Sequence, residues 1–341
     1  MFSIMIRIAI IGAGRIGHVH ARAVANHPQA ELVLVCDPFE KNAKELSAQY
    51  GVKYCLDPQE VFSSPDVDAV IIGSPTRFHV DHILAAVKAG KKVMSEKPIA
   101  LDLASAKRCV DELGDAADHV MMGFNRRFDP SFAEIHHRVA DGEVGDLQQL
   151  IVVSRDPAAP PAEYVAGSGG IFKDMTIHDF DTVRFFLGDI AEVTAVGTNV
   201  DEAIKAQGDF DQVLVTLKSV DGKLATIVNS RSCAFGYDQR LEAFGADGML
   251  SADNLTETAV RKASGNQTEA KSAVMDFFLD RYEDAYRIEL GHFIEAAASG
   301  EAVSPSVRDG YAALQLAEAA GLSAKEGRTV AIEANKVPAA V

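Results

Sequence analysis

The sequence contains no tryptophan and few basic side chains for its length of 341 residues. Lys and Arg number 33 against 49 Asp and Glu, which gives a formal net charge of −16. Because sequence-independent nucleic-acid binding needs clustered cations, this balance argues against a nucleic-acid partner. No stretch reaches the roughly 20 apolar residues that cross a bilayer, and no basic segment precedes the first apolar run. We therefore expect neither a membrane span nor a signal peptide.

Cysteine is also scarce, and the four cysteines lie far apart without any C-x-x-C pair: Cys36, Cys55, Cys109 and Cys233. Such spacing is typical neither of a disulfide framework nor of a zinc site. We expect reduced thiols, a cytoplasmic location and no structural metal.

The first 120 residues alternate short apolar runs with stretches of helical spacing. The runs cover residues 6–11, 32–36, 69–72, 92–95 and 119–123. Runs that are apolar on both faces are typical of a parallel sheet with helices on both sides. The alternation predicts an α/β domain over residues 1–124, with a doubly wound parallel sheet.

Beyond residue 124 the predicted strands follow one another with little between them. They cover residues 147–154, 192–198, 212–218, 223–230, 240–244 and 249–252, and helices are expected over 170–187, 282–298 and 307–324. This order predicts a second, α+β domain over 125–306, built on an open, mostly antiparallel sheet. The apolar, alanine-rich face of 307–324 suggests that this closing helix packs back on the first domain.

A glycine motif follows the first predicted strand and opens a helix. Gly12, Gly14 and Gly17 enclose Arg15 and Ile16, and Asp37 ends the second strand 20 residues after Gly17. This spacing is typical of a Rossmann dinucleotide site, where the glycines allow a tight turn, close approach of a pyrophosphate and close helix packing. The Asp37 carboxylate can accept hydrogen bonds from both ribose hydroxyls of NAD but would repel the 2′-phosphate of NADP, so we expect NAD as the cofactor.

Further candidates follow the third and fourth strands at the same predicted sheet edge. Ser74, Pro75, Thr76 and His79 are expected to touch the cofactor, although the His79 ring could equally point to solvent. Glu96 and Lys97 follow the fourth strand, and Pro98 favours an extended backbone at Lys97. Both side chains are therefore expected beside the nucleotide.

The predicted helix over 170–187 carries Asp174 and His178 on one polar face, opposite an apolar face. Gly169 and Gly170 before it would allow close approach of another segment. This pattern favours a buried polar cleft; the alternative is an i,i+4 pair that only stabilises the helix.

Three spaced motifs resemble those of the glucose-fructose oxidoreductase and inositol dehydrogenase family: Glu96-Lys97-Pro98, the segment 123–129 and the segment 169–179. The resemblance covers nearly the whole chain, and residues 154–157 and 236–240 are most similar to the inositol-oxidising members. It implies that Lys97, Asp174 and His178 are catalytic. Chemically, His178 suits a base that removes a hydroxyl proton, Asp174 would orient its ring, and Lys97 would stabilise the reacting oxygen. Which of Lys97 and His178 takes the proton first stays open.

The expected substrate is a cyclic polyol, most similar to myo-inositol, bound by Arg127, Arg155, Asp156 and Tyr237 together with the three catalytic residues. Oxidation of scyllo-inositol or of an aldose, and a non-catalytic dinucleotide sensor, are the alternatives. A homotetramer is expected through the outer face of the second sheet, because its strands carry apolar residues on both faces. The family resemblance implies tetramers as well.

Overall fold

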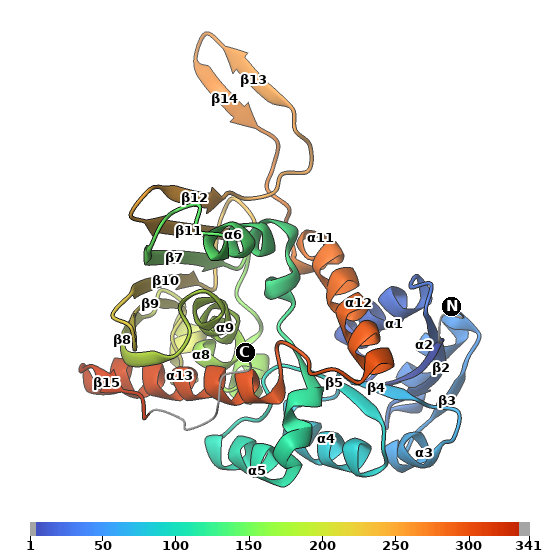
Figure 1. Ribbon diagram of the computed structural model, residues 1–341. Coiled ribbons are helices and arrows are strands. Elements are labelled where there is room, and N and C mark those ends of the chain that lie inside the picture. Colours follow the sequence, from blue (N-terminus) through green and yellow to red (C-terminus); the bar gives the residue numbers. More distant parts are fainter. Residues whose placement is uncertain (1–4, 334–341) are drawn as a thin grey trace. The chain divides into compact units, whose positions relative to one another are not determined.

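The computed structural model describes residues 5–333 and consists of two compact units (Figure 1). The first unit runs to Phe128 and includes Asp284–Leu314; the second is Asp129–Glu283 with the chain from Gln315 on. The sequence-based division differs from this one, since it gave 125–306 entirely to the second domain and 307–324 entirely to the first. An apolar helix face does not reveal which sheet it covers.

The first unit holds a six-stranded parallel sheet with the order β3-β2-β1-β4-β5-β6. Its strands are β1 Ile6–Ile11, β2 Ala30–Cys36, β3 Lys53–Cys55, β4 Ala69–Ile72, β5 Lys92–Glu96 and β6 Val120–Gly123. The connecting helices are α1 Arg15–Ala25, α2 Glu40–Tyr50, α3 Pro58–Ser63, η1 Thr76–Phe78, α4 His79–Lys88, α5 Leu103–Leu113, η2 Gly114–His119 and η3 Asn125–Phe128. The predicted doubly wound parallel sheet is confirmed. Among the six strands only β3 was not predicted, because two of its three residues are exposed.

Helix α12 (Glu283–Ser299) completes the core of the first unit, although the sequence placed it in the second domain. Leu290, Phe293 and Ile294 are buried in one cluster with Ile8 and Ile10 of β1. The chain then continues along β6, where the Met122 amide donates to the Pro305 carbonyl at 3.0 Å. Helix α13 (Val307–Glu326) follows and is divided between the two units after Leu314.

The second unit is built on a seven-stranded sheet with the order β12-β11-β7-β10-β9-β8-β15. Its strands are β7 Leu147–Arg155, β8 Ile190–Thr198, β9 Gln212–Ser219, β10 Leu224–Ser230, β11 Asp238–Gly245, β12 Met249–Ala252 and β15 Val330–Ala331. Only the pairing of β7 with β10 is parallel, so the predicted mostly antiparallel sheet is confirmed. A hairpin of β13 (Arg261–Ser264) and β14 (Gln267–Lys271) extends from this unit.

The helices of the second unit are α6 Pro130–Ala140, α7 Ala162–Ser168, α8 Ile171–Asp174, α9 Thr176–Leu187, α10 Glu202–Lys205 and α11 Phe278–Arg281. The single helix expected over 170–187 is therefore wrong: the chain breaks at Met175, whose φ and ψ are −100° and −61°. Asp174 ends the short α8 and His178 lies in α9, so the two do not share one continuous helical face. Between residues 5 and 333, no helix is long and apolar enough to cross a membrane.

Candidate active site

The glycine motif forms the turn between β1 and α1, and its three glycines have different surroundings. Gly12 has a φ of +103°, and a Cβ there would lie 2.5 Å from the Gly73 carbonyl oxygen. A Cβ at Gly17 would lie 2.0 Å from the Gly12 carbonyl oxygen. Gly14, by contrast, has no atom within 4 Å of such a Cβ and forms the N-cap of α1. The open space at Gly14, before a helix N-terminus, fits the pyrophosphate of a dinucleotide.

Asp37 lies directly after β2 and is nearly buried, with its carboxylate held by two backbone amides. The Ala13 amide donates to Oδ2 and the Phe39 amide to Oδ1, each at 2.8 Å. These bonds tie the carboxylate to the glycine turn and leave lone pairs on both oxygens for further donors. Its position fits the ribose hydroxyls of a dinucleotide.

His79 lies at the start of α4, and its ring is buried between two loops rather than directed to solvent. Nδ1 is 2.8 Å from the Pro98 carbonyl oxygen, and Nε2 is 2.7 Å from the Ser74 carbonyl oxygen. Burial lowers the pKa of His79, and the two backbone hydrogen bonds only partly oppose this. His79 therefore joins the loop after β4 to the loop after β5. A cofactor contact by its ring would have to replace one of these bonds.

Lys97 follows β5 and is half-buried, next to the carboxylate of Glu96. The Lys97 amide donates to Glu96 Oε2 at 3.3 Å, while His20 Nε2 lies 2.8 Å from Glu96 Oε1. His20 comes from α1 and is almost fully buried. The glycine-motif helix is thus bonded to the segment that carries Lys97.

The other residues predicted in the first unit lie around this edge. Thr76 and Ser74 are half-buried, whereas Pro75 and Arg15 are exposed. Arg127 is buried in η3, where it donates to Ser304 Oγ and to Asp309 Oδ1, each at 3.1 Å.

In the second unit, the predicted substrate segments meet at one end of the sheet. Arg155, the last residue of β7, pairs with Ser230 of β10 on one side and with Asp238 of β11 on the other. The amide of Asp156 donates to the Ser230 carbonyl at 2.9 Å. Residues from three strands are therefore gathered at this end.

Asp238 is fully buried there and binds two arginines. Arg155 Nη1 donates to its Oδ2 at 2.5 Å, and Arg240 Nε donates to its Oδ1 at 2.7 Å. Burial by itself raises the pKa of Asp238, but hydrogen bonds from Arg240, Asn254 and Arg155 outweigh it and hold the pKa below its usual value. Arg155 thus already has a structural partner besides its predicted role toward substrate.

Helix α9 is pinned to the same end of the sheet by Asp179, the residue after His178. The buried Asp179 carboxylate accepts from Ser154 Oγ at 2.6 Å and from Asn229 Nδ2 at 2.8 Å. Tyr237 is also buried, with its ring edge-on to that of Tyr282 at 5.9 Å. His178 and Tyr237 therefore both lie on elements that converge at this end.

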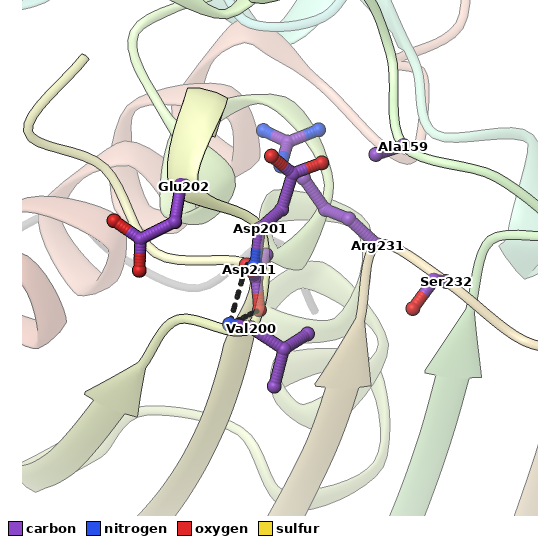
Figure 2. A pocket seen from close by; sticks show the side chains of 7 residues that line it. All are labelled: Ala159, Val200, Asp201, Glu202, Asp211, Arg231 and Ser232. Atoms are coloured by element: carbon purple, nitrogen blue, oxygen red, sulfur yellow. Dashed lines mark hydrogen bonds between the residues drawn. The ribbon is translucent and has the colours of Figure 1, made fainter. Parts of the chain in front are cut away.

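Asp174 receives hydrogen bonds from two residues that the sequence patterns did not single out. Tyr164 of α7 donates to its Oδ1 at 3.0 Å, and Arg231 donates to its Oδ2 at 3.2 Å. Arg231 comes directly after β10 and also lines a pocket with Asp201 and Asp211 (Figure 2). The one available signal was a lone basic residue at the end of an apolar strand, which is too common a pattern to identify a partner. Among residues 5–333, no cluster of three His, Cys, Asp or Glu side chains could hold a metal ion.

Comparisons with known proteins identify the family of the chain. Residues 6–124 match the oxidoreductase family with an NAD-binding Rossmann fold, and residues 132–251 match the GFO/IDH/MocA C-terminal domain. The inositol 2-dehydrogenase of Rhizobium meliloti is 42% identical over 96% of this chain and 99% of its own.

The solved structures to which the chain is similar include inositol dehydrogenases. A myo-inositol dehydrogenase from Corynebacterium glutamicum is 51% identical, with a TM-score of 0.94, over 97% of this chain and all of its own. The scyllo-inositol dehydrogenase of Lactobacillus casei, solved with NAD(H) and scyllo-inositol, is 30% identical with a TM-score of 0.89 over 96% of this chain and 99% of its own. The family that the sequence motifs indicated is confirmed: the chain belongs to the GFO/IDH/MocA oxidoreductases and carries their NAD-binding Rossmann fold.

Proposed function

We propose that the protein oxidises a secondary hydroxyl of a cyclic polyol with NAD, and that myo-inositol is the substrate and its 2-keto derivative the product. The observation that carries this proposal is the gathering of Arg155, Asp156, Tyr237 and the start of α9 at one end of the second sheet. A polyol has hydroxyls on all sides, so its recognition needs several fixed donors and acceptors. Relatives named for myo-inositol support the choice of substrate.

The residues that would hold NAD are those of the glycine turn and Asp37, with the loop after β4 and Glu96 beside them. When bound, NAD supplies the acceptor for a hydride. The Asp37 carboxylate is held by the Ala13 and Phe39 amides. It would accept hydrogen bonds from the ribose hydroxyls of NAD and would repel the 2′-phosphate of NADP. NAD is therefore the proposed cofactor in preference to NADP.

For the proton, we assign His178 as the base that removes it from the substrate hydroxyl. An imidazole has a reference pKa of about 6.5 and suits this role near neutral pH. Asp174 stabilises the imidazolium that forms, and the Lys97 ammonium stabilises negative charge on the reacting oxygen.

Scyllo-inositol is the second candidate substrate, because the Lactobacillus casei relative is named for it. The two stereoisomers differ in the direction of one hydroxyl. Their discrimination therefore depends on which donors in the second unit face that hydroxyl.

The catalytic assignment is tested by Lys97→Ala and His178→Ala. We expect kcat to fall about 10²- to 10⁴-fold in each, since general acid–base groups contribute on this scale. NADH binding, followed by fluorescence titration, should stay unchanged. Lys88→Ala and His137→Ala, both at exposed helical positions, are matched controls that should retain wild-type kcat. Lost NADH binding in a folded variant would show that the roles are misassigned.

The outer face of the second sheet supports the proposal of a homotetramer. Val196, Leu214 and Val228 form one row across three strands, and the next residue in the row, Val153, is already buried within the chain. Val196 is 58% exposed and Leu214 51% exposed. A solvated sheet face is normally polar, so this row favours burial against a second copy of the chain.

We expect a tetramer in light scattering at micromolar concentration, and a smaller species after Leu214→Lys, which places a charge in the centre of the row. Val200→Lys, at an exposed position beyond the end of β8, is the control and should leave the mass unchanged. A monomeric wild-type protein would contradict the proposal.

The four cysteines are buried and form no disulfide. This state is the one expected in a reducing compartment, and the cytoplasm is accordingly the proposed location.

A further inference from the structure

Arg231 is a buried cation placed between two carboxylates of the second unit. Its side chain is only 1% exposed, its Nη1 donates to Asp174 Oδ2 at 3.2 Å, and its Nη2 lies 3.5 Å from Asp209 Oδ2. Removing a guanidinium from water costs several kcal/mol unless anions and hydrogen bonds compensate. The Asp174 carboxylate accepts a hydrogen bond and the Asp209 carboxylate supplies an ion pair, so the position of Arg231 and that of Asp174 are coupled.

Asp209 fixes the other end of α8. Both of its carboxylate oxygens accept from the Ile171 amide at 3.0 Å, which anchors the first residue of this helix. Gly170 has a φ of +85°, and a Cβ there would lie 2.7 Å from Asp209 Oδ1. The glycine is needed because the carboxylate approaches the backbone so closely.

Helix α8 has only four residues, and so short a helix has no stability of its own. Its geometry must come from bonds to the rest of the second unit. Arg231 provides these at both ends, through Asp209 at Ile171 and directly at Asp174. Tyr164 donates to the remaining Asp174 oxygen, but its own side chain is 53% exposed. Arg231 is therefore a buried partner that fixes the Asp174 carboxylate.

We propose that Arg231 is a positioning residue of the reaction: it holds the Asp174 carboxylate in its working orientation and, through Asp209, holds α8 in place. This inference rests on the catalytic role proposed above for Asp174. Arg231 itself touches neither reacting atom in this scheme, so its effect on turnover passes entirely through Asp174.

A double-mutant cycle in the full-length protein tests this, with Arg231→Met, Asp174→Asn and the double variant. We expect Arg231→Met to lower kcat about 10- to 100-fold, the scale on which a misplaced catalytic group acts, with unchanged NADH binding. Arg231→Lys, which keeps the charge, should recover part of the loss. The double variant should be no slower than Asp174→Asn alone, because both changes act through one carboxylate.

Arg184→Met is the matched control: this arginine pairs with Asp189 at the far end of α9 and should leave kcat unchanged. If Arg231→Met fails to fold, as judged by circular dichroism, the same cycle with Arg231→Lys decides the question. Additive losses in the double variant, or wild-type kcat in the Arg231 variants, would overturn the inference and leave the role of Asp174 intact. Wild-type turnover by Asp174→Asn would overturn both.

Discussion

Each unit holds one carboxylate with a proposed function in place with two donors, but the two units do so by different means. Asp37 of the first unit is held by backbone amides of Ala13 and Phe39, at 2.8 Å each. Asp174 of the second unit is held by the side chains of Tyr164 and Arg231. Backbone donors persist as long as the turn folds, whereas a side-chain donor is removed by one substitution. Substitutions that add side-chain atoms next to the backbone should therefore have the larger effect in the first unit. Substitutions that remove a charged side chain should have the larger effect in the second unit.

The largest effect that follows from this difference is expected at the glycines. Gly17→Ala forces a Cβ to within 2.0 Å of a backbone oxygen, so we expect it to cost about 4 kcal/mol or more of folding free energy. Gly14→Ala meets no neighbouring atom and should unfold with the wild-type midpoint, yet bind NADH more weakly. Denaturant unfolding and NADH titration of both variants separate the two roles. Equal destabilisation by both substitutions would contradict the assignment.

A smaller effect is expected at Asp238, whose carboxylate is held only by side chains. Asp238→Asn should cost about 2 kcal/mol at neutral pH, because charge-assisted hydrogen bonds from Arg155 and Arg240 are weakened. Since the folded-state pKa of Asp238 is depressed, the carboxylate stabilises the fold above its unfolded pKa of about 3.9, and this contribution is lost as the pH falls through the folded pKa. The difference in the free energy of unfolding between Asp238→Asn and wild type should therefore become smaller below about pH 4, as measured by urea unfolding at a series of pH values. A gap that widens on acidification would refute this account.

The smallest effect concerns cofactor choice. Asp37→Ala removes the repulsion toward a 2′-phosphate, together with the two hydrogen bonds that the carboxylate accepts from the Ala13 and Phe39 amides. We expect the kcat/KM preference for NAD over NADP to narrow about tenfold. Asp57→Ala, an exposed carboxylate that caps α3, is the control and should keep the wild-type ratio. A wild-type enzyme that prefers NADP would show that Asp37 does not select the cofactor.

The sequence was informative where function depends on neighbours along the chain. The spacing of Gly12, Gly14, Gly17 and Asp37 predicted the turn, because each position is set by one strand–turn–helix unit. Continuous apolar runs likewise predicted five of the six parallel strands, since both faces of that sheet are covered.

The sequence was uninformative where contacts join distant segments. The bond from Arg231 to Asp174 spans 57 residues, and no local pattern pairs them. The break at Met175 was missed for the same reason: the bond from Asp209 to Ile171 stabilises α8 from outside its own sequence. The sequence predicted a helix over 282–298 but not the sheet that it covers, which is why α12 was placed in the other domain.

Steady-state kcat/KM for NAD reduction, measured with myo-inositol, scyllo-inositol and a panel of aldoses, tests the proposed inositol dehydrogenase activity. We predict the highest kcat/KM for myo-inositol, with a large loss in Lys97→Ala and His178→Ala. A higher value for an aldose, or no NAD reduction with any inositol isomer by a folded protein that binds NADH, would contradict it.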